Sequence, residues 1–343
     1  MSRCLWMLLL CGACGACGAA AEPRSYEVLM LLFRGCEESC RGFQDHFRRQ
    51  GVRARFTLRA AEQEPRRIAG FVAEARRLRP DLIVAWGTTV ALEVVGQWDA
   101  VDRARHVTDI PVVFMAVTDP LRSRLVPTLA GSGRNLAGTL YLLPVAEQLQ
   151  AARAYMEFRK LGFLYNPAEA NSLISLQDLR AQASRFGFDM VVETLPVGGN
   201  GQPVASDIPG RIAALAAAGV DLLYFSPDSF LNSQRRLVTG EALAHRMPVF
   251  AATEAPVTQA DALFGVLNRY DQIGRFTARL ALRILQDGAR PGELPVELPR
   301  QFSYLINLRV AHRLGRYPPL PLLDIAEIVG RPECRDRKGN RCD

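Results

Sequence analysis

The sequence predicts an α/β fold with two doubly wound parallel-sheet lobes, because one strand–helix–strand pattern occurs twice along the chain. In the first copy, residues 81–89 (DLIVAWGTT) precede residues 111–119 (PVVFMAVTD), and in the second copy residues 221–229 (DLLYFSPDS) precede residues 248–254 (PVFAATE). The two segments begin 30 residues apart in the first copy and 27 in the second, which is the length of one strand–helix–strand unit. Two such units far apart in one chain indicate two similar lobes.

In the first part of the chain, apolar strands alternate with amphipathic helices. The helix over 39–50 ends at Gly51, and the helix over 65–78 has a proline in its first turn, where proline is tolerated. The runs of Val, Ile, Leu and Phe in the strands are typical of parallel strands covered on both faces. The expected strands are 26–33, 52–59, 81–86 and 111–117, and the expected helices are 39–50, 65–78 and 88–98.

The glycine-rich segment 131–139 interrupts this series and is the first expected crossing between the lobes. A second alternating series follows, and such alternation implies parallel sheets with right-handed crossovers. Its expected strands are 161–165, 189–195, 221–225, 248–252, 262–267 and 301–306, and its expected helices are 144–158, 172–186, 208–218, 229–245, 270–286 and 308–314.

The N-terminal residues 1–21 are predicted to form a secretory signal peptide. Arg3 gives a short positive region, residues 5–10 form an apolar core too short to span a bilayer, and the three alanines at the end fit a cleavage site. We therefore expect an exported, periplasmic protein. Cys14 and Cys17 each follow Gly-Ala, which partly resembles a bacterial lipobox, so a lipid anchor stays open as an alternative to a free periplasmic protein.

Four cysteines remain after the expected cleavage, and an even number of cysteines in an oxidising compartment favours disulfides. Of the three pairings that four cysteines allow, the two local ones are favoured by their short loops. A metal site is the alternative, but the spacings match no zinc pattern and the four histidines are widely scattered, so we expect no metal. The disulfide candidates are Cys36 with Cys40 and Cys334 with Cys342.

The composition allows two domains and does not favour nucleic-acid binding. The chain has 343 residues, 49% of them hydrophobic, which is enough for two cores. Its net charge of +7 comes almost wholly from arginine, since the only lysines are Lys160 and Lys338. The arginines are scattered and form no basic stripe with interleaved aromatic residues, so a coding bias explains them better than a nucleic-acid surface.

The common sequence signatures of enzymes are missing from this chain. It has no G-x-x-x-x-G-K-[ST] phosphate loop, no G-x-G-x-x-G after the first strand and no G-x-S-x-G elbow. The glycine-rich segments 131–135 and 198–201 do not lie between a strand and a helix, so we interpret both as turns. We therefore expect no catalytic residues and no cofactor.

Polar residues follow several of the predicted strands, at the edge where open α/β sheets bind ligands. Thr88 and Ser172 are as well explained as helix N-caps as they are by ligand contact, and Trp86 could belong to the core. Asp119 and Glu254 each end one copy of the repeat, so we expect their carboxylates to face each other across a cleft, where they would suit an ammonium group.

Six segments together resemble the family of ABC-transporter substrate-binding proteins that includes tryptophan- and tyrosine-binding lipoproteins. The resemblance covers about residues 26–315, and it implies a type I periplasmic-binding fold whose two lobes close on a small ligand, often an aromatic amino acid. The segments are 79–89 (RPDLIVAWGTT), 110–120 (IPVVFMAVTDP), 133–139 (GRNLAGT), 161–172 (LGFLYNPAEANS), 247–254 (MPVFAATE) and 306–315 (INLRVAHRLG).

The resemblance also implies three crossings between the lobes and hence their boundaries. The first lobe would comprise residues 22–138 plus 268–289, and the second residues 139–267 plus 290–315. Residues 316–343, which are rich in Pro, Arg and Cys, are expected to form a peripheral tail.

The ligand-facing motifs of the family map onto Thr118 and Asp119 in one lobe and onto Asn171 and Ser172 in the other. This chain departs from the family after the first strand, where it reads FRGCEESCRG, and Arg34 in this segment could contact an anionic group. The full set of candidate ligand-binding residues is Arg34, Trp86, Thr88, Thr89, Thr118, Asp119, Tyr165, Asn171, Ser172, Asp228, Glu254 and Asn268.

The predicted function is that of an extracytoplasmic solute-binding protein of an ABC importer, monomeric and without catalysis of its own. Its expected partners are a small polar ligand, with aromatic amino acids favoured, and an ABC permease in the inner membrane. One alternative is a ligand-sensing input protein for a membrane signalling partner. An enzyme on the same scaffold is a further alternative, which the missing signatures disfavour.

Overall fold

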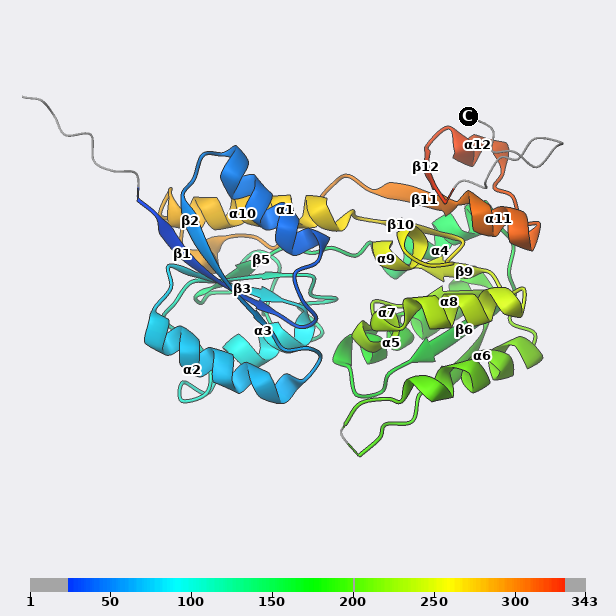
Figure 1. Cartoon of the computed structure of the whole chain (residues 1–343), viewed down its shortest axis with the longest axis horizontal. Coiled ribbons are helices and arrows are strands. Elements are labelled where there is room, and N and C mark those ends of the chain that lie inside the picture. The colour runs from blue at the N-terminus through cyan, green and yellow to red at the C-terminus, as the bar shows by residue number, and fades with distance from the viewer. Residues whose placement is uncertain (1–23, 200, 331–343) are drawn as a thin grey trace, which may run out of the picture.

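The computed structural model describes residues 24–199 and 201–330, which form two α/β lobes side by side (Figure 1). The first lobe contains a five-stranded sheet in the order β2-β1-β3-β4-β5, and all of its strand pairs are parallel. This agrees with the predicted class of fold. The strands are β1 (Tyr26–Leu32), β2 (Ala54–Ala60), β3 (Leu82–Trp86), β4 (Val112–Met115) and β5 (Leu136–Gly138).

The second lobe contains a seven-stranded sheet in the order β12-β11-β10-β9-β8-β6-β7. Its strands pair in parallel except for β10 and β11, which are antiparallel. The strands are β6 (Lys160–Tyr165), β7 (Asp189–Thr194), β8 (Leu222–Phe225), β9 (Val249–Ala251), β10 (Phe264–Leu267), β11 (Ser303–Asn307) and β12 (Ala326–Val329).

Helices cover both faces of the first sheet. Helices α1 and α10 lie on one face and α2 and α3 on the other (Figure 1). Their bounds are α1 (Glu38–Arg49), α2 (Ile68–Leu78), preceded by the 3-10 helix η1 (Pro65–Arg67), α3 (Thr88–Val95) and α10 (Tyr270–Leu285).

The helices of the second lobe are shorter on average, and several begin directly after a strand. They are α4 (Val145–Tyr155), α5 (Ala170–Phe186), η2 (Ala205–Asp207), α6 (Ile208–Ala217), α7 (Ser229–Ser233), α8 (Arg235–Ala244), α9 (Glu254–Thr258), η3 (Pro291–Glu293) on the return crossing, α11 (Leu308–Leu314) and α12 (Leu320–Leu323). None of the helices in the described parts of the chain is both long and apolar enough to cross a membrane.

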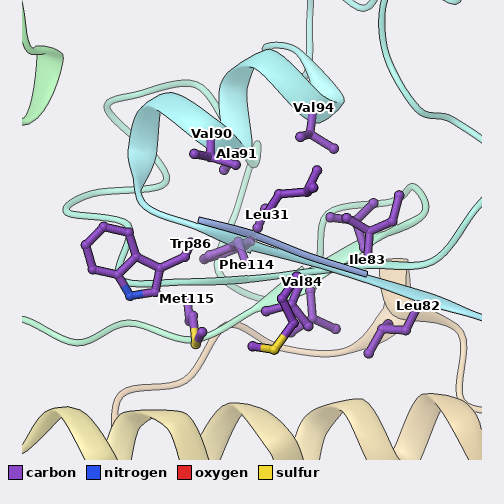
Figure 2. Packing of buried hydrophobic residues seen from close by; sticks show 14 of the residues in the cluster. Leu31, Leu82, Ile83, Val84, Trp86, Val90, Ala91, Val94, Phe114 and Met115 are labelled. Carbon is purple, nitrogen blue, oxygen red and sulfur yellow. The ribbon is translucent and has the colours of Figure 1, made fainter. Parts of the chain in front are cut away.

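The core of the first lobe explains the uninterrupted apolar runs of its strands. Every residue of β3 and β4 is buried, because the sheet is covered on both faces. Figure 2 shows Val90, Ala91 and Val94 of α3 packed over one face of the sheet, close to Phe114. Burial on both faces holds the carboxyl ends of these strands in fixed positions.

The chain passes between the lobes three times, after β5, between β10 and α10, and between α10 and β11. Two of these crossings are joined by a hydrogen bond, in which Nδ2 of Asn268 donates to the carbonyl oxygen of Tyr141 at 2.9 Å. The crossings hold the carboxyl ends of the two sheets toward each other.

Four elements of the described chain, β5, α9, α12 and β12, were not expected from the sequence. Strand β5 lies within the segment interpreted as a glycine-rich break, and Gly138 is needed there because a Cβ would lie 2.3 Å from the ring of Phe114. Helix α9 follows β9 directly. The tail expected beyond residue 315 instead adds α12 and β12, and β12 pairs in parallel with β11 at the edge of the sheet.

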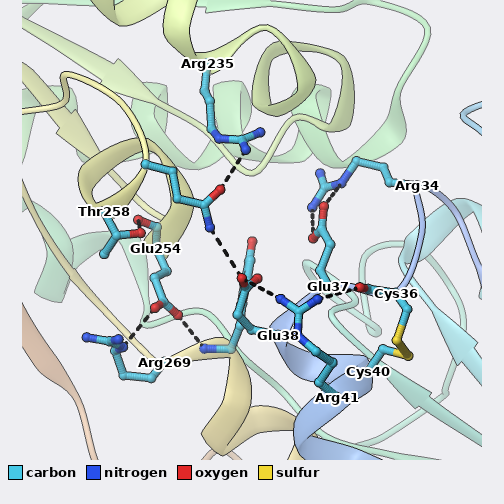
Figure 3. Close-up of polar contacts among 12 residues, drawn as sticks. Arg34, Cys36, Glu37, Glu38, Cys40, Arg41, Arg235, Glu254, Thr258 and Arg269 are labelled. Atoms are coloured by element: carbon cyan, nitrogen blue, oxygen red, sulfur yellow. Dashed lines mark hydrogen bonds and ion pairs between the residues drawn. A yellow bond between two sulfur atoms is a disulfide. The ribbon is translucent and has the colours of Figure 1, made fainter.

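The local disulfide predicted between Cys36 and Cys40 is confirmed and bridges the start of α1 (Figure 3). The pair Cys334 and Cys342 lies outside the described residues, as does the predicted signal peptide.

A double variant, Cys36→Ser with Cys40→Ser, should lower the free energy of unfolding by about 2 kcal/mol, because the disulfide closes a short loop in the unfolded chain. Chemical denaturation measures this loss. A reductant should destabilise the wild-type protein by the same amount and leave the double variant unchanged. Equal sensitivity of both proteins to the reductant would contradict the assignment.

Helices α1 and α10 pack through glycine. A Cβ on Gly274 would lie 2.0 Å from the carbonyl oxygen of Ser39, whereas a Cβ on Gly70 in α2 would meet open space. Gly274→Ala should therefore destabilise the protein by about 1–3 kcal/mol through overpacking. Gly70→Ala is the matched control and should leave stability unchanged or raise it by up to about 1 kcal/mol. Similar unfolding midpoints for the two variants would contradict this packing.

Candidate ligand-binding site

A pocket lies between the lobes, where the carboxyl ends of the two sheets face each other. It is narrow in this structure, with room for about one water molecule. Its lining comprises Phe33, Arg34, Trp86, Gly87, Thr88, Thr89, Ala116, Thr118 and Tyr141, together with Asn171, Pro227, Ser229, Asn232, Thr253 and Tyr270.

Half of the candidate residues line this pocket, and they come from both lobes. The six are Arg34, Trp86, Thr88, Thr89, Thr118 and Asn171. The other six do not line it; they are Asp119, Tyr165, Ser172, Asp228, Glu254 and Asn268.

Arg34 follows β1 and extends into the pocket over the ring of Trp86, with its guanidinium carbon 4.6 Å from the ring centroid. Its Nε and Nη2 donate to the two carboxylate oxygens of Glu37 at 2.9 and 2.7 Å (Figure 3). Burial alone would lower the pKa of Arg34, but the ion pair with Glu37 outweighs it, so the pKa lies above its ordinary value. Arg34 is therefore charged and fixed.

The Trp86 ring is fixed as well, because its Nε1 donates to Oγ of Ser39 at 2.8 Å. Thr88 begins α3, but its hydroxyl accepts from the backbone N–H of Thr118 at 3.2 Å and does not cap its own helix. No side chain caps the first turn of α3, and this turn lines the pocket. Its N–H groups can therefore bind an acceptor on a ligand.

On the opposite wall, Asn171 is held by two hydrogen bonds from its Nδ2. These go to Oε2 of Glu169 at 3.1 Å and to the carbonyl oxygen of Pro227 at 2.6 Å. Glu169 is buried and also accepts from the backbone N–H groups of Ser229 and Phe230, each at 3.0 Å. Its negative charge therefore lies behind the wall, and Oδ1 of Asn171 is left to accept from a ligand.

Asp228 and Ser172, both expected to contact ligand, instead build this wall from behind. Oδ2 of Asp228 accepts from Oγ of Ser172 at 2.5 Å and from the backbone N–H of Asn166 at 2.9 Å, and Oδ1 caps α7 at Leu231. Burial raises the pKa of Asp228 to about 7, and the neighbouring carboxylate of Glu169 adds to the rise.

Asp119 and Glu254 do not face each other as expected. Asp119 caps its own turn by accepting from the N–H groups of Leu121 and Arg122, and it lines a separate pocket on the hinge side. Glu254 accepts from the N–H of Tyr270 at 2.7 Å and forms an ion pair with Arg269 at 2.9 Å (Figure 3). Both carboxylates are engaged by neighbouring backbone or side-chain donors, which explains the difference.

Tyr165 and Asn268 also lie outside the lining. The ring of Tyr165 packs against that of Phe163, with centroids 5.8 Å apart. Asn268 supports the crossings through its bond to Tyr141. Residue type and position after a strand were insufficient to separate such supporting residues from pocket residues.

The pocket contains aromatic residues that were not predicted, among them Phe33, Tyr141 and Tyr270. Tyr141 lies on the first crossing, and its hydroxyl is 3.4 Å from that of Thr118. Burial raises the pKa of Tyr270 to about 12, so its hydroxyl stays protonated and can donate. The only available signal was that both tyrosines adjoin predicted crossings. Asn232 was also missed.

Contacts between the lobes surround the pocket. Arg122 reaches across to Asp178 and Gln177 on α5, and Nε2 of Gln259 donates to Glu38 at 3.4 Å. The lobes are therefore closed on the pocket, which explains its small free space. Within residues 24–199 and 201–330, no group of three or more His, Cys, Asp or Glu side chains is placed to hold a metal ion.

The chain is similar in sequence to known proteins. The family model described as ABC transporter substrate binding protein matches residues 32–326. The chain is 28% identical over 201 residues to a tyrosine-binding protein of Clostridioides difficile (strain R20291). That match covers 58% of this chain and 55% of the relative, so the chain aligns with only about half of the relative's length.

Two solved structures have the same two-lobed fold. One is a conserved domain protein from Vibrio cholerae, with 25% identity and a TM-score of 0.78. The other is an ABC domain from Streptococcus pneumonia in complex with L-Trp, with 22% identity and a TM-score of 0.77. Each match covers 89% of this chain and 100% of the other. The fold is that of type I periplasmic binding proteins, as the sequence predicted.

The raised pKa of Asp228 predicts a pH dependence of stability. Its pKa is higher in the folded state than the value of about 4 in the unfolded chain, so its contribution is full below pH 4 and is lost as the pH rises toward 7. Between these pH values the wild type should lose roughly 2–4 kcal/mol relative to Asp228→Asn, which does not titrate. Denaturant unfolding at several pH values measures this difference. If the free energies of unfolding of the wild type and Asp228→Asn change in parallel with pH, the prediction is wrong.

Proposed function

Because the chain belongs to the ABC transporter substrate-binding protein family, we propose that it is an extracytoplasmic solute-binding protein that binds an amino acid between its lobes, with aromatic amino acids favoured. The observation that carries this proposal is that the two lobes supply opposite walls of one pocket. A ligand that contacts both walls favours the closed arrangement over the open one.

The chemistry of the two walls suits a zwitterion. The first lobe offers donors, namely the uncapped N–H groups of α3 and the guanidinium of Arg34. The second lobe offers the amide oxygen of Asn171, with the carboxylate of Glu169 behind it. A ligand carboxylate would face the first wall, and its ammonium group would face the second.

Aromatic side chains support the preference for an aromatic ligand. Phe33, Trp86, Tyr141 and Tyr270 all line the pocket and can contact a ring edge-on or by stacking. Two relatives also support an aromatic ligand, since one is a tyrosine-binding protein and the other was solved in complex with L-Trp.

The proposal extends to the cellular role. The protein would be exported, either free in the periplasm or held by a lipid anchor, and as a monomer it would deliver its ligand to an ABC permease for import. The family is one of solute-binding proteins and not of enzymes, so no catalysis is assigned to the pocket.

Thermal and chemical unfolding against a panel of ligands tests the proposal. L-Tyrosine, L-tryptophan, L-leucine and small inorganic anions form a suitable panel. A ligand present at one hundred times its dissociation constant should add about 2.7 kcal/mol to the free energy of unfolding. If no compound in the panel stabilises the protein, the assignment of an amino-acid ligand loses its basis.

A matched pair of variants locates the site. Thr118→Val keeps the side-chain volume but removes a hydroxyl that lines the pocket, so the best ligand should bind about tenfold more weakly. Thr108→Val makes the same change at an exposed position and should leave affinity unchanged. Calorimetric titration measures both, and equal affinities would place the ligand elsewhere.

A further inference from the structure

We propose that Arg34 is a specificity-determining residue, and that the terminal edge of its guanidinium exchanges the amide oxygen of Asn232 for the carboxylate of the ligand. The inference rests on the proposed function, since it requires that an amino acid enters this pocket.

The guanidinium of Arg34 has two edges that can each bind a carboxylate. The side edge, formed by Nε and Nη2, is occupied by both oxygens of Glu37. The terminal edge, formed by Nη1 and Nη2, points to Asn232. With the Asn232 amide oriented so that its oxygen faces Arg34, that oxygen lies 2.9 Å from both nitrogens. Only this second edge is open to exchange.

The contacts with Glu37 and Trp86 fix the position of Arg34. Glu37 immediately precedes α1, whose start is bridged by the disulfide between Cys36 and Cys40. Trp86 supports one face of the guanidinium and is itself bonded to Ser39 of α1. The side chain is therefore ordered before ligand arrives, and binding costs less conformational entropy than it would for a free arginine.

The contact with Asn232 is the one that a ligand can replace. Asn232 belongs to α7 of the second lobe, so its contact with Arg34 crosses the pocket and breaks when the lobes separate. One neutral amide oxygen shares two N–H groups, whereas a carboxylate offers each N–H its own charged acceptor. Both contacts have the charged guanidinium as donor, but the carboxylate adds a charged acceptor to each bond and forms a bidentate pair.

Charge decides which carboxylates are accepted. Arg34 is already neutralised by Glu37, and Glu169 adds a further negative charge near enough to influence Arg34. A simple anion would therefore meet a net negative surrounding. An amino acid brings an ammonium group that compensates its own carboxylate and faces the wall in front of Glu169. The site should thus select zwitterions over simple acids, whereas an amine lacks the carboxylate that Arg34 and the first turn of α3 would bind.

Calorimetric titration with three probes tests the role of Arg34. The probes are L-tyrosine, tyramine, which lacks the carboxylate, and 3-(4-hydroxyphenyl)propionate, which lacks the ammonium group. The wild type should bind L-tyrosine most tightly. In Arg34→Gln, the affinity for L-tyrosine should fall on the order of 100-fold and the affinity for tyramine by less than about threefold. Arg34→Lys keeps the charge but loses the planar pair of N–H donors, so its affinity for L-tyrosine should fall about tenfold.

The matched control is Arg55→Gln, which removes an exposed ion pair with Glu27 near the start of β1 and β2. It should leave the affinity for all three probes unchanged. If Arg34→Gln lowers the affinities for L-tyrosine and tyramine equally, or lowers neither of them, Arg34 does not bind the carboxylate. The proposal is then overturned. The Lys variant decides the same question if the Gln variant does not fold. If the wild type binds L-tyrosine but these differences are missing, only this inference fails. If it binds neither these probes nor any amino acid of the unfolding panel, both proposals fail.

Asn232→Ala tests the exchange itself. Removing the competing amide oxygen should leave L-tyrosine bound as tightly as in the wild type or up to about fivefold more tightly. A loss of tenfold or more would show that Asn232 holds the ligand, and the exchange would then be wrong.

Discussion

The structure depends on one geometric constraint, which is that parallel strands bring all their carboxyl ends to the same edge of a sheet. In the first lobe this edge carries Arg34 after β1, Trp86 at the end of β3 and Thr118 after β4. In the second it carries Asn171 and the turn before α7. The three crossings hold these two edges toward each other, so the pocket is a consequence of topology and not of any single loop.

Buried charge is the second feature that holds the site together. An unpaired buried carboxylate is costly, and here each one is surrounded by donors. Glu169 accepts four hydrogen bonds, from Asn166, Asn171, Ser229 and Phe230. Glu37 is paired with Arg34 on the other wall. These groups fix the backbone turns around the pocket, which allows neutral side chains such as Asn171 to present their polar atoms in a defined direction.

Much of this could be predicted from the sequence, because local pattern determines strands and helices and the repeat of strand ends indicates a shared edge. The strand ends at Trp86, Thr88 and Thr118 were identified for that reason. Asp119 and Glu254 were not placed correctly, because an acid after a strand can cap its own turn as readily as it can face a cleft. Tyr141 and Tyr270 depend on how the crossings bring the lobes together, which no local pattern contains.

The most direct measurement is a crystal structure of the protein grown with L-tyrosine. We expect one amino acid in the pocket between the lobes, with its carboxylate at the first turn of α3 and Arg34 and its ammonium group at Asn171. Density for the ligand on the hinge side, among Leu140, Leu142 and Asp119, or contact with one lobe alone, would contradict the account.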